Sequence, residues 1–240
     1  MMNYVRFLIG LLVFVLQGWT VQAQGDISEE QILVVDSLYR EDQVYIGLGL
    51  DLLTNKPEGI SQNGFSGHFS VGFIRDMPFN KRRNKSIGVG LGLGVDVYNQ
   101  NLFIGEESDD TTSIYAIVPD NIGQVKNRFS YYSVQMPIQY RWRTSSATDY
   151  TFWRIYTGIQ LEYIYHFKST FEQSGNTVNQ TKIPELNKIQ YGLTFAFGYS
   201  AFNLKVYYGL NSLFNEDAIL TNGNKVDLQV LRLGLQFYFL

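Results

Sequence analysis

Hydrophobic and polar residues alternate with a period of two in eight separate segments of this 240-residue chain. In residues 44–52 every even position is aliphatic, while the odd positions hold tyrosine, glycine and aspartate. Such alternation places apolar side chains on one face of a strand and polar side chains on the other. The other segments with this pattern are 65–73, 87–97, 132–142, 153–165, 189–199, 204–210 and 231–239. The sequence therefore predicts an all-β fold of eight strands, most of them long enough to cross a bilayer when tilted.

The first residues have the pattern of an export signal. Arg6 precedes an apolar run at 7–16, and a small-residue cleavage site follows at Ala23. This run is shorter than the roughly 20 residues that a membrane-spanning helix needs, and no later apolar run is longer. Any crossing of a membrane by the mature chain must therefore use strands. We expect a signal peptide at 1–23, a periplasmic N-terminal segment at 24–42 and a barrel at 43–240.

Alternation fits both a soluble β-sandwich and a membrane barrel, and the composition of the polar face separates them. Charged residues are only 17% of the chain, and the polar face is rich in Gly, Ser and Gln. A sandwich would present a charged face to water, whereas the narrow interior of a small barrel favours small, uncharged side chains. Four aromatic residues near strand ends fit a membrane-interface girdle at one rim: Trp142, Trp153, Tyr199 and Phe239. We predict an eight-stranded antiparallel transmembrane β-barrel in an outer membrane.

The connections between strands alternate in length. Long connections at 53–64, 98–131, 166–188 and 211–230 alternate with shorter ones at 74–86, 143–152 and 200–203. Outer-membrane barrels have long extracellular loops and short periplasmic turns, so both termini should lie in the periplasm. The aromatic-rich last strand also resembles the signal read by the barrel-assembly machinery. That machinery and the outer-membrane lipid are therefore expected partners.

Several charged residues and one histidine share the interior-facing parity. Charges in a confined, poorly hydrated space must pair, so we expect an ion-pair network that fills the lumen, with a narrow conduit as the alternative. The expected members are Asp51, His68, Asp96, Arg141, Arg154, Glu162, Lys205 and Arg232.

Other chemistry is weakly represented in the sequence. The histidines are His68 and His166, and neither lies in a catalytic motif, although a serine contact at His68 is conceivable. The acidic run Glu106, Glu107, Asp109 and Asp110 is interpreted as a solvated loop, with Ca²⁺ binding as the alternative. The chain lacks cysteine, and its net charge is -3. We expect a non-enzymatic protein without metal or cofactor and with no affinity for nucleic acid.

One turn is longer and more basic than a reversal of direction requires. We consider two roles for it: a solvated basic rim near lipid phosphates and a docking surface for an acidic periplasmic partner. The candidate docking residues are Arg75, Asp76, Pro78, Lys81, Arg82, Arg83 and Lys85.

The segment Val35-Asp-Ser-Leu-Tyr-Arg-Glu-Asp-Gln43, the turn at 72–84, the glycine-alternating strand after it and Met136-Pro-Ile-Gln-Tyr-Arg141 resemble the PorT family, called SprT in gliding bacteria. The resemblance covers nearly the whole mature chain, and the basic turn is its most specific element. It implies a Bacteroidetes outer-membrane protein needed for type IX protein secretion and gliding motility. On this basis we expect an accessory or assembly component. The alternative is a general small barrel of the OmpX/OmpW sort, for envelope integrity or uptake of small molecules.

Overall fold

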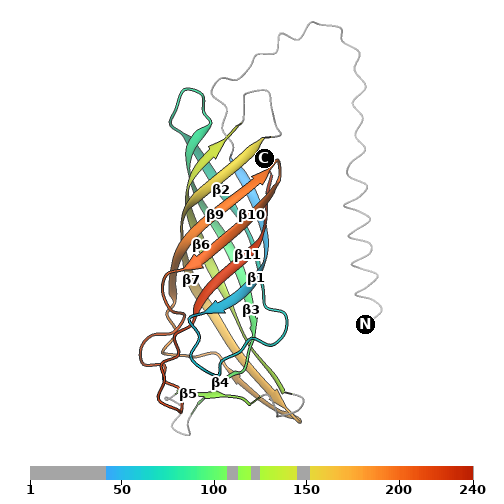
Figure 1. The fold of residues 1–240 in the computed structure, drawn as a ribbon, viewed down its shortest axis with the longest axis vertical. Coiled ribbons are helices and arrows are strands. Elements are labelled where there is room, and N and C mark those ends of the chain that lie inside the picture. The colour runs from blue at the N-terminus through green and yellow to red at the C-terminus, as the bar shows by residue number, and fades with distance from the viewer. Residues whose placement is uncertain (1–41, 107–112, 120–124, 145–151, 240) are drawn as a thin grey trace, which may run out of the picture. The chain divides into compact units, whose positions relative to one another are not determined.

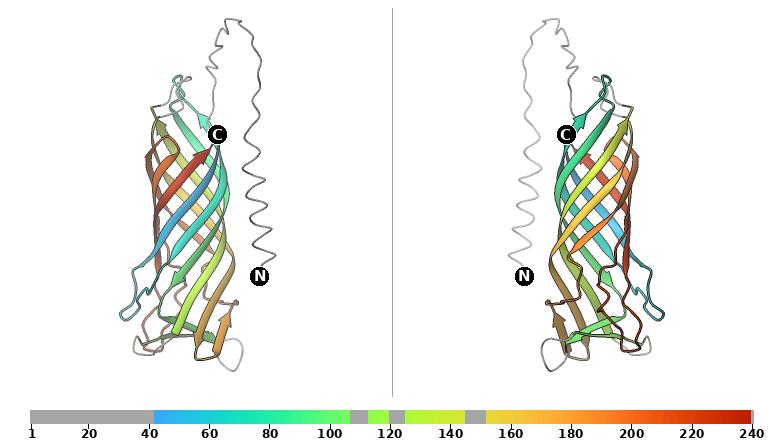
Figure 2. Two further views of the ribbon diagram at one scale, coloured as in Figure 1. Left: turned by 90° about the vertical axis from the view of Figure 1, so that its right-hand side faces the viewer. Right: turned by 90° about the vertical axis from the view of Figure 1, so that its left-hand side faces the viewer.

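The protein forms a closed antiparallel β-barrel in the computed structural model, which describes residues 42–106, 113–119, 125–144 and 152–239 (Figures 1 and 2). Each barrel strand pairs with its neighbours in the chain, and β1 with β11 and β6 with β7 complete the cylinder. The barrel strands are β1 (Gln43–Thr54), β2 (Gly67–Pro78), β3 (Lys85–Asn99), β6 (Val125–Arg143), β7 (Trp153–Gln173), β9 (Ile189–Tyr199), β10 (Phe202–Gly209) and β11 (Gln229–Phe239). The prediction of an eight-stranded antiparallel barrel is confirmed. In the part of the chain described, no helix is long and apolar enough to span a membrane.

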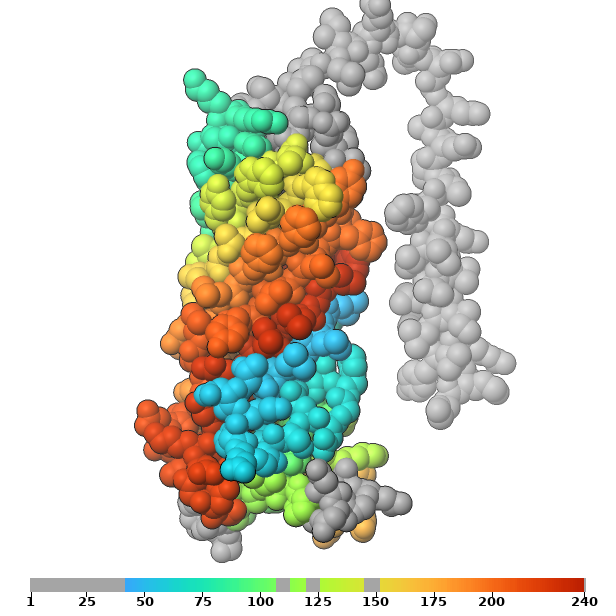
Figure 3. Space-filling model, in the orientation of Figure 1, coloured from blue at the N-terminus to red at the C-terminus, as the bar shows by residue number. Residues whose placement is uncertain are grey.

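The wall of the barrel is apolar on its outside. Figure 3 shows from one side that the side chains of successive strands form a continuous surface of tilted bands. Outward side chains such as Leu91, Leu193 and Leu204 are half to two-thirds exposed, as expected for residues that face lipid. Inward positions of the same strands hold glycine and buried polar residues, including Ser133, Gln135 and Gln236. The period-two pattern of the sequence thus corresponds to lipid outside and lumen inside.

The alternating glycines of β3 make room for large side chains in the lumen. A Cβ atom on Gly88 would lie 2.6 Å from Cδ of Arg141. At Gly94 a Cβ atom would lie 2.2 Å from Nε2 of Gln135. The interior of a barrel of this size is filled by side chains, so one strand must be thin where its neighbours are bulky.

The strands are longer than the period-two pattern predicted. β3 ends at Asn99, β6 begins at Val125 and β7 ends at Gln173, inside the segments 98–131 and 166–188 that we expected to be loops. In these extensions the polarity of the two faces is reversed: apolar side chains such as Phe129 and Phe167 point inward and are buried. The strands leave the lipid here, so the outside becomes wet and the inside is packed by apolar residues.

The long connections pack together over one mouth of the barrel, here called the loop end (Figures 1 and 2). The hairpin of β4 (Leu102–Glu106) and β5 (Ser113–Ile117) lies there, and β8 (Asn176–Gln180) pairs with the extension of β7. A hydrophobic core joins these loops to the strand extensions. Its members include Leu102, Tyr115, Phe129, Phe167, Leu186, Phe214, Leu220 and Leu228.

The basic turn at the opposite end, the turn end, is shorter than expected. β2 continues to Pro78 and β3 begins at Lys85, so the connection is 79–84 rather than 74–86. From residue 67 to 73 the apolar side chains of β2 face outward, but at the next two positions the apolar Ile74 faces inward and the charged Arg75 faces outward. The period-two pattern therefore stops at residue 73 although the strand continues. Ile74 joins a second apolar cluster inside the barrel with Tyr45, Tyr156, Ala196 and Tyr238.

Two expectations concern residues outside the described part of the chain. These are the signal peptide with nearly all of the segment 24–42, and the acidic residues Glu107, Asp109 and Asp110. Asp42 is the first described residue, and its side chain accepts a hydrogen bond from the backbone N–H of Asp76 at 2.8 Å. The start of the described chain is thereby tied to β2.

Candidate functional site: a filled lumen between two end surfaces

Arg232 of β11 is the centre of an ion-pair layer in the lumen. Its Nε lies 2.9 Å from Oδ1 of Asp96 and 3.3 Å from Oδ1 of Asp51, and its two terminal nitrogens bind the carboxylate of Glu162. Nη2 also donates to the hydroxyl of Tyr131 at 2.8 Å. One guanidinium therefore holds together three carboxylates that are almost completely buried. An unpaired charge in such a place would cost several kcal/mol, about 3–5 by analogy with other buried pairs.

Lys205 and Gln160 extend this layer across the barrel. Nζ of Lys205 donates to Oε1 of Gln160 at 3.0 Å, and Nε2 of Gln160 donates to Oε1 of Glu162 at 2.7 Å. The cavity beside them, which His68 also lines, measures about 20 Å³. That is room for about one water molecule. The centre of the lumen is therefore filled by side chains.

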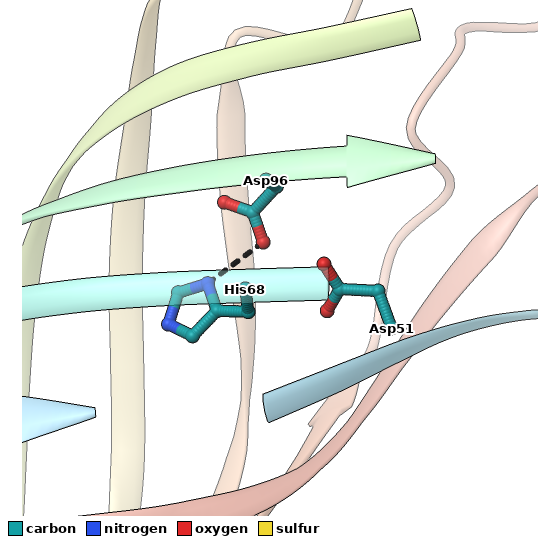
Figure 4. Close-up of side chains that lie close together, drawn as sticks. All are labelled: Asp51, His68 and Asp96. Atoms are coloured by element: carbon teal, nitrogen blue, oxygen red, sulfur yellow. Dashed lines mark hydrogen bonds and ion pairs between the residues drawn. The ribbon is translucent and has the colours of Figure 1, made fainter. Parts of the chain in front are cut away.

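His68, Asp51 and Asp96 bring three potential metal ligands together in this layer (Figure 4). Their ligand atoms lie within 4.8 Å of one another, and Nδ1 of His68 is 2.9 Å from Oδ1 of Asp96. The donor types suit a divalent cation. However, the guanidinium of Arg232 already supplies a positive charge to both carboxylates. The arrangement is explained as an ion-pair layer in which His68 is hydrogen-bonded.

A second ion-pair layer lies nearer the turn end, around Asp76. Oδ1 of Asp76 accepts hydrogen bonds from Nη1 of Arg141 at 2.9 Å and from the hydroxyl of Ser86 at 2.6 Å. Nη2 of Arg143 donates to Oδ2 of the same carboxylate at 2.7 Å. Asp76 and both arginines are fully buried. This corrects the expectation that Asp76 belongs to the docking surface: because β2 continues past residue 73, its side chain points into the lumen.

The residues expected in a single network are thus divided between separate places in the barrel. Asp51, His68, Asp96, Glu162, Lys205 and Arg232 meet in the central layer. Arg141 belongs to the second layer and also lies 4.2 Å above the ring of Tyr156. Arg154 lies close to the turn end, where it binds the backbone carbonyl of Ser200 and covers the ring of Phe152. Arg143 was missed because the strand was expected to end at residue 142 and the connection to begin at 143, whereas β6 continues to Arg143.

The loop end is closed by polar contacts as well as by its hydrophobic core. The hydroxyls of Ser113 and Tyr115 both donate to Oε2 of Glu185, at 2.8 and 2.9 Å. Burial, together with the neighbouring Glu185 carboxylate, raises the pKa of Tyr115, so its hydroxyl stays a neutral donor. These bonds fasten β5 to the connection between β8 and β9. Sequence reasoning had no signal for this closure, because the residues involved are about seventy positions apart.

The turn-end surface presents the basic residues that the sequence singled out. Lys81, Arg82 and Lys85 are exposed, whereas Pro78 and Arg83 are partly buried. The backbone of Arg83 has a φ of 55°, and its carbonyl accepts a hydrogen bond from Arg143 at 2.9 Å. The turn is thereby anchored to the second ion-pair layer. Arg75 lies apart from these residues, on the outer wall of β2.

Aromatic residues occur on the outer wall near both ends. Trp153 contacts Tyr199 and Phe197, with ring centroids 5.2 Å apart in each case. Trp153, Tyr199 and Phe239 are about half exposed, as girdle residues should be, and Trp142 is partly buried. A second group of exposed tyrosines, which we had not assigned to a girdle, lies toward the loop end: Tyr132, Tyr163, Tyr165, Tyr191 and Tyr208. His166 joins this group at an irregularity in the β6–β7 pairing, with its ring centroid 5.6 Å from that of Tyr132.

Comparison with a family model supports the architecture. A family model described as "Outer membrane protein beta-barrel domain" matches residues 22–215. No curated protein matches the chain significantly. Among solved structures, Ail, the attachment invasion locus protein of Yersinia pestis, is similar over 84% of this chain and 100% of its own. Its complex with the heparin analogue sucrose octasulfate has 16% identity and a TM-score of 0.36, and a second structure of Ail has 15% and 0.36. A chain from a structure described as "Asymmetric conductivity of engineered proteins" is also similar over 84% of this chain and 100% of its own, with 8% identity and a TM-score of 0.21.

An apolar outer wall, aromatic residues near both ends and complete closure of the sheet define a transmembrane β-barrel. The family match places such a barrel in the outer membrane. This chain belongs to the outer membrane protein beta-barrel domain family.

Proposed function

We propose that this protein is a non-enzymatic, closed barrel that serves as an accessory or assembly component of type IX protein secretion, and of gliding motility where that is present. The filled lumen carries the proposal. Two layers of buried ion pairs and a packed loop end occupy the barrel, so it offers no passage to a secreted protein. A barrel of this kind can contribute through its surfaces instead. The assignment to type IX secretion is supported by the resemblance of the basic turn to the PorT family.

The proposal includes an orientation in which both termini are periplasmic. Long loops at one end and short turns at the other support it, because this is the arrangement of outer-membrane barrels. The turn end with Lys81, Arg82 and Lys85 then faces the periplasm. Three exposed cations beside a rigid ion-pair layer are suited to dock an acidic surface of a secretion component. His68 lies in the filled centre of the lumen beside a cavity of about 20 Å³, which is too small for a substrate, and this favours a non-enzymatic role.

Replacing Lys81, Arg82 and Lys85 together by serine should remove secretion components from a gentle detergent pull-down of the tagged protein. Rim charges steer and orient association, so their loss weakens docking while the buried layers remain intact. Arg83 is kept, because its backbone is part of the turn's anchor. The measurement is mass spectrometry of the co-purified outer-membrane proteins, with secretion of a reporter as the second readout.

A matched control removes the same charge from the opposite end, with Lys56, Lys182 and Lys188 changed to serine. All three are exposed. This control should retain the co-purified components. Recovery of the barrel alone from wild-type membranes, or equal loss in both variants, would contradict the docking role.

Planar bilayers should show no stable channel when the purified wild-type protein is inserted. The residual space of about 20 Å³ in the central layer is too small for a hydrated ion path. Reproducible unitary conductance steps would contradict a closed lumen. They would favour the alternative of a general small OmpX/OmpW-like barrel that admits small molecules. The other version of that alternative, a small barrel that contributes to envelope integrity, is also consistent with membership of the family.

A further inference from the structure

Among the described barrel strands, one seam of the loop-side wall presents cations to the outside, the seam between β6 and β7. Lys126 and Arg128 face outward from β6, Lys168 faces outward from β7, and all three side chains are exposed. The other outward-facing cations of the described strands are Arg75 and Lys85, which lie near the turn end. The positive charge of the loop-side wall is therefore confined to the β6–β7 seam.

The pairing register of the seam brings two of these cations together. Arg128 lies opposite Thr170, and Ser130 lies opposite Lys168, so Arg128 and Lys168 are diagonal neighbours on one face. Such neighbours are roughly 7–8 Å apart, and long side chains at this spacing can converge on one anion. Within the described residues neither cation has a carboxylate partner. We call Arg128 and Lys168 the cation pair.

The cation pair lies at the depth of lipid headgroups. Tyr132 and His166 face each other in the next outward row toward the middle of the wall. From Tyr132 to Trp142 in the girdle of the turn end, β6 rises about 25 Å along the barrel axis at the rise and tilt usual for such strands. That rise equals the usual height of the apolar band. The cation pair, beyond Tyr132, is therefore just outside the hydrocarbon layer.

A groove of about 370 Å³ borders the cation pair on its loop side, and Arg128 and Thr170 belong to its lining. Lys126 and Glu172, 3.8 Å apart, also line the groove and offset each other's charge, so Arg128 leaves it with a positive charge. The remaining lining residues are uncharged: Asn63, Asn99, Gln100, Asn101, Val118, Pro119 and Asn127. A recess of this composition next to an anion site suits the polar, uncharged part of a headgroup.

We propose that the β6–β7 seam binds a phosphorylated glycolipid of the surrounding membrane. Arg128 and Lys168 hold its phosphate, because charge-assisted hydrogen bonds from these side chains are the strong contacts to phosphate. The hydroxyl of Ser130 lies between them and can donate to the same group. The sugar next to the phosphate occupies the groove, and the acyl chains lie along apolar outward residues such as Met136 and Tyr163. This inference goes beyond the proposed role in secretion, which uses the turn end.

Native mass spectrometry of the full-length protein in detergent measures the binding of three lipids. Lipid A with two phosphates is the proposed class of ligand, and lipid A without phosphates has the same sugars and chains. Phosphatidic acid carries a phosphate without a sugar. Wild type should bind phosphorylated lipid A best. Changing Arg128 and Lys168 together to glutamine should lower this affinity about 10-fold or more, because each cation near an anionic membrane surface contributes about a fivefold gain.

Two control variants separate the cation pair from charge in general. Lys56→Gln with Lys225→Gln removes the same charge from exposed positions on the connections next to β1 and β11, across the closed barrel from the seam. This variant should bind like wild type. Arg128→Lys with Lys168→Arg keeps both charges and should retain most of the affinity. Without lipid, the unfolding midpoint of the glutamine variant should equal that of wild type, because both side chains are exposed.

Five results would overturn the proposal. They are equal affinity of wild type for both forms of lipid A, unchanged binding in the glutamine variant of the cation pair, and an equal loss in the Lys56 and Lys225 control. Tighter binding of phosphatidic acid than of lipid A would rule out the glycolipid, and complete displacement by equimolar inorganic phosphate would rule out a membrane source. These readouts in detergent depend neither on secretion nor on the orientation of the barrel, so the proposed function can fail while lipid binding stands, and the reverse.

Discussion

Replacing Arg232 by methionine should destabilise the folded barrel by about 3–5 kcal/mol, the usual cost of removing one partner from a buried ion pair. The guanidinium contacts Asp51, Asp96 and Glu162, all of which are almost completely buried. Methionine fills much of the same volume, so loss of charge pairing rather than a cavity should dominate. Urea-induced unfolding from lipid vesicles, followed by tryptophan fluorescence, measures the difference in the free energy of unfolding.

Two further variants make this prediction sharp. Adding Asp51→Asn, Asp96→Asn and Glu162→Gln to the Arg232→Met background should recover a large part of the lost stability, because the buried negative charges are then removed. Lys225→Met breaks an exposed pair with Glu216 and should cost at most about 1 kcal/mol. If Arg232→Met were no more harmful than Lys225→Met, the central layer would not be a determinant of stability.

Substitution of Gly94 by alanine should lower the free energy of unfolding by about 1–3 kcal/mol, as overpacking does in a filled core. In an ordinary strand the same change is stabilising, because glycine has the larger conformational entropy when unfolded. Here the added Cβ would lie 2.2 Å from Nε2 of Gln135 and 2.9 Å from Oγ of Ser133. The sign of the effect therefore reports whether the lumen is packed at this level. The measurement is again urea-induced unfolding from vesicles.

A double-mutant cycle with Gln135→Ala isolates the contact. The close neighbours of the added methyl group are side-chain atoms of Gln135 and Ser133, so shortening Gln135 should relieve much of the strain. Gly94→Ala should then be nearly neutral or stabilising in the Gln135→Ala background. An equal penalty in both backgrounds would show that the strain arises from the strand backbone instead of from lumen packing.

Local reasoning succeeded where one strand and its period were enough. Parity alone assigned Asp51, Asp96 and Arg232 to the lumen side of their strands, and the structure places their side chains there. The same reasoning stopped too early in β2, because Ile74 is apolar and faces inward while Arg75 is charged and faces outward. Asp76 keeps the inward parity, but it was assigned to a turn because the strand was expected to end at residue 73. Parity also gave no pairing partners. Arg232 and Glu162 are 70 residues apart, and Arg141 and Asp76 are 65 apart, so only closure of the sheet decides which charges meet.

By itself the sequence determined that this chain forms eight strands with one apolar face, because the side-chain period of a strand is fixed by its backbone geometry. That face requires lipid, and closure follows since an open sheet edge in lipid leaves backbone groups unbonded. The tertiary structure alone decided that the loops fill the mouth of the barrel. Phe129, Phe167 and Phe214 come from distant parts of the chain, with ring centroids 5.5 to 6.4 Å apart. Their burial depends on strands that bring them together, and no periodic pattern within a loop encodes that approach.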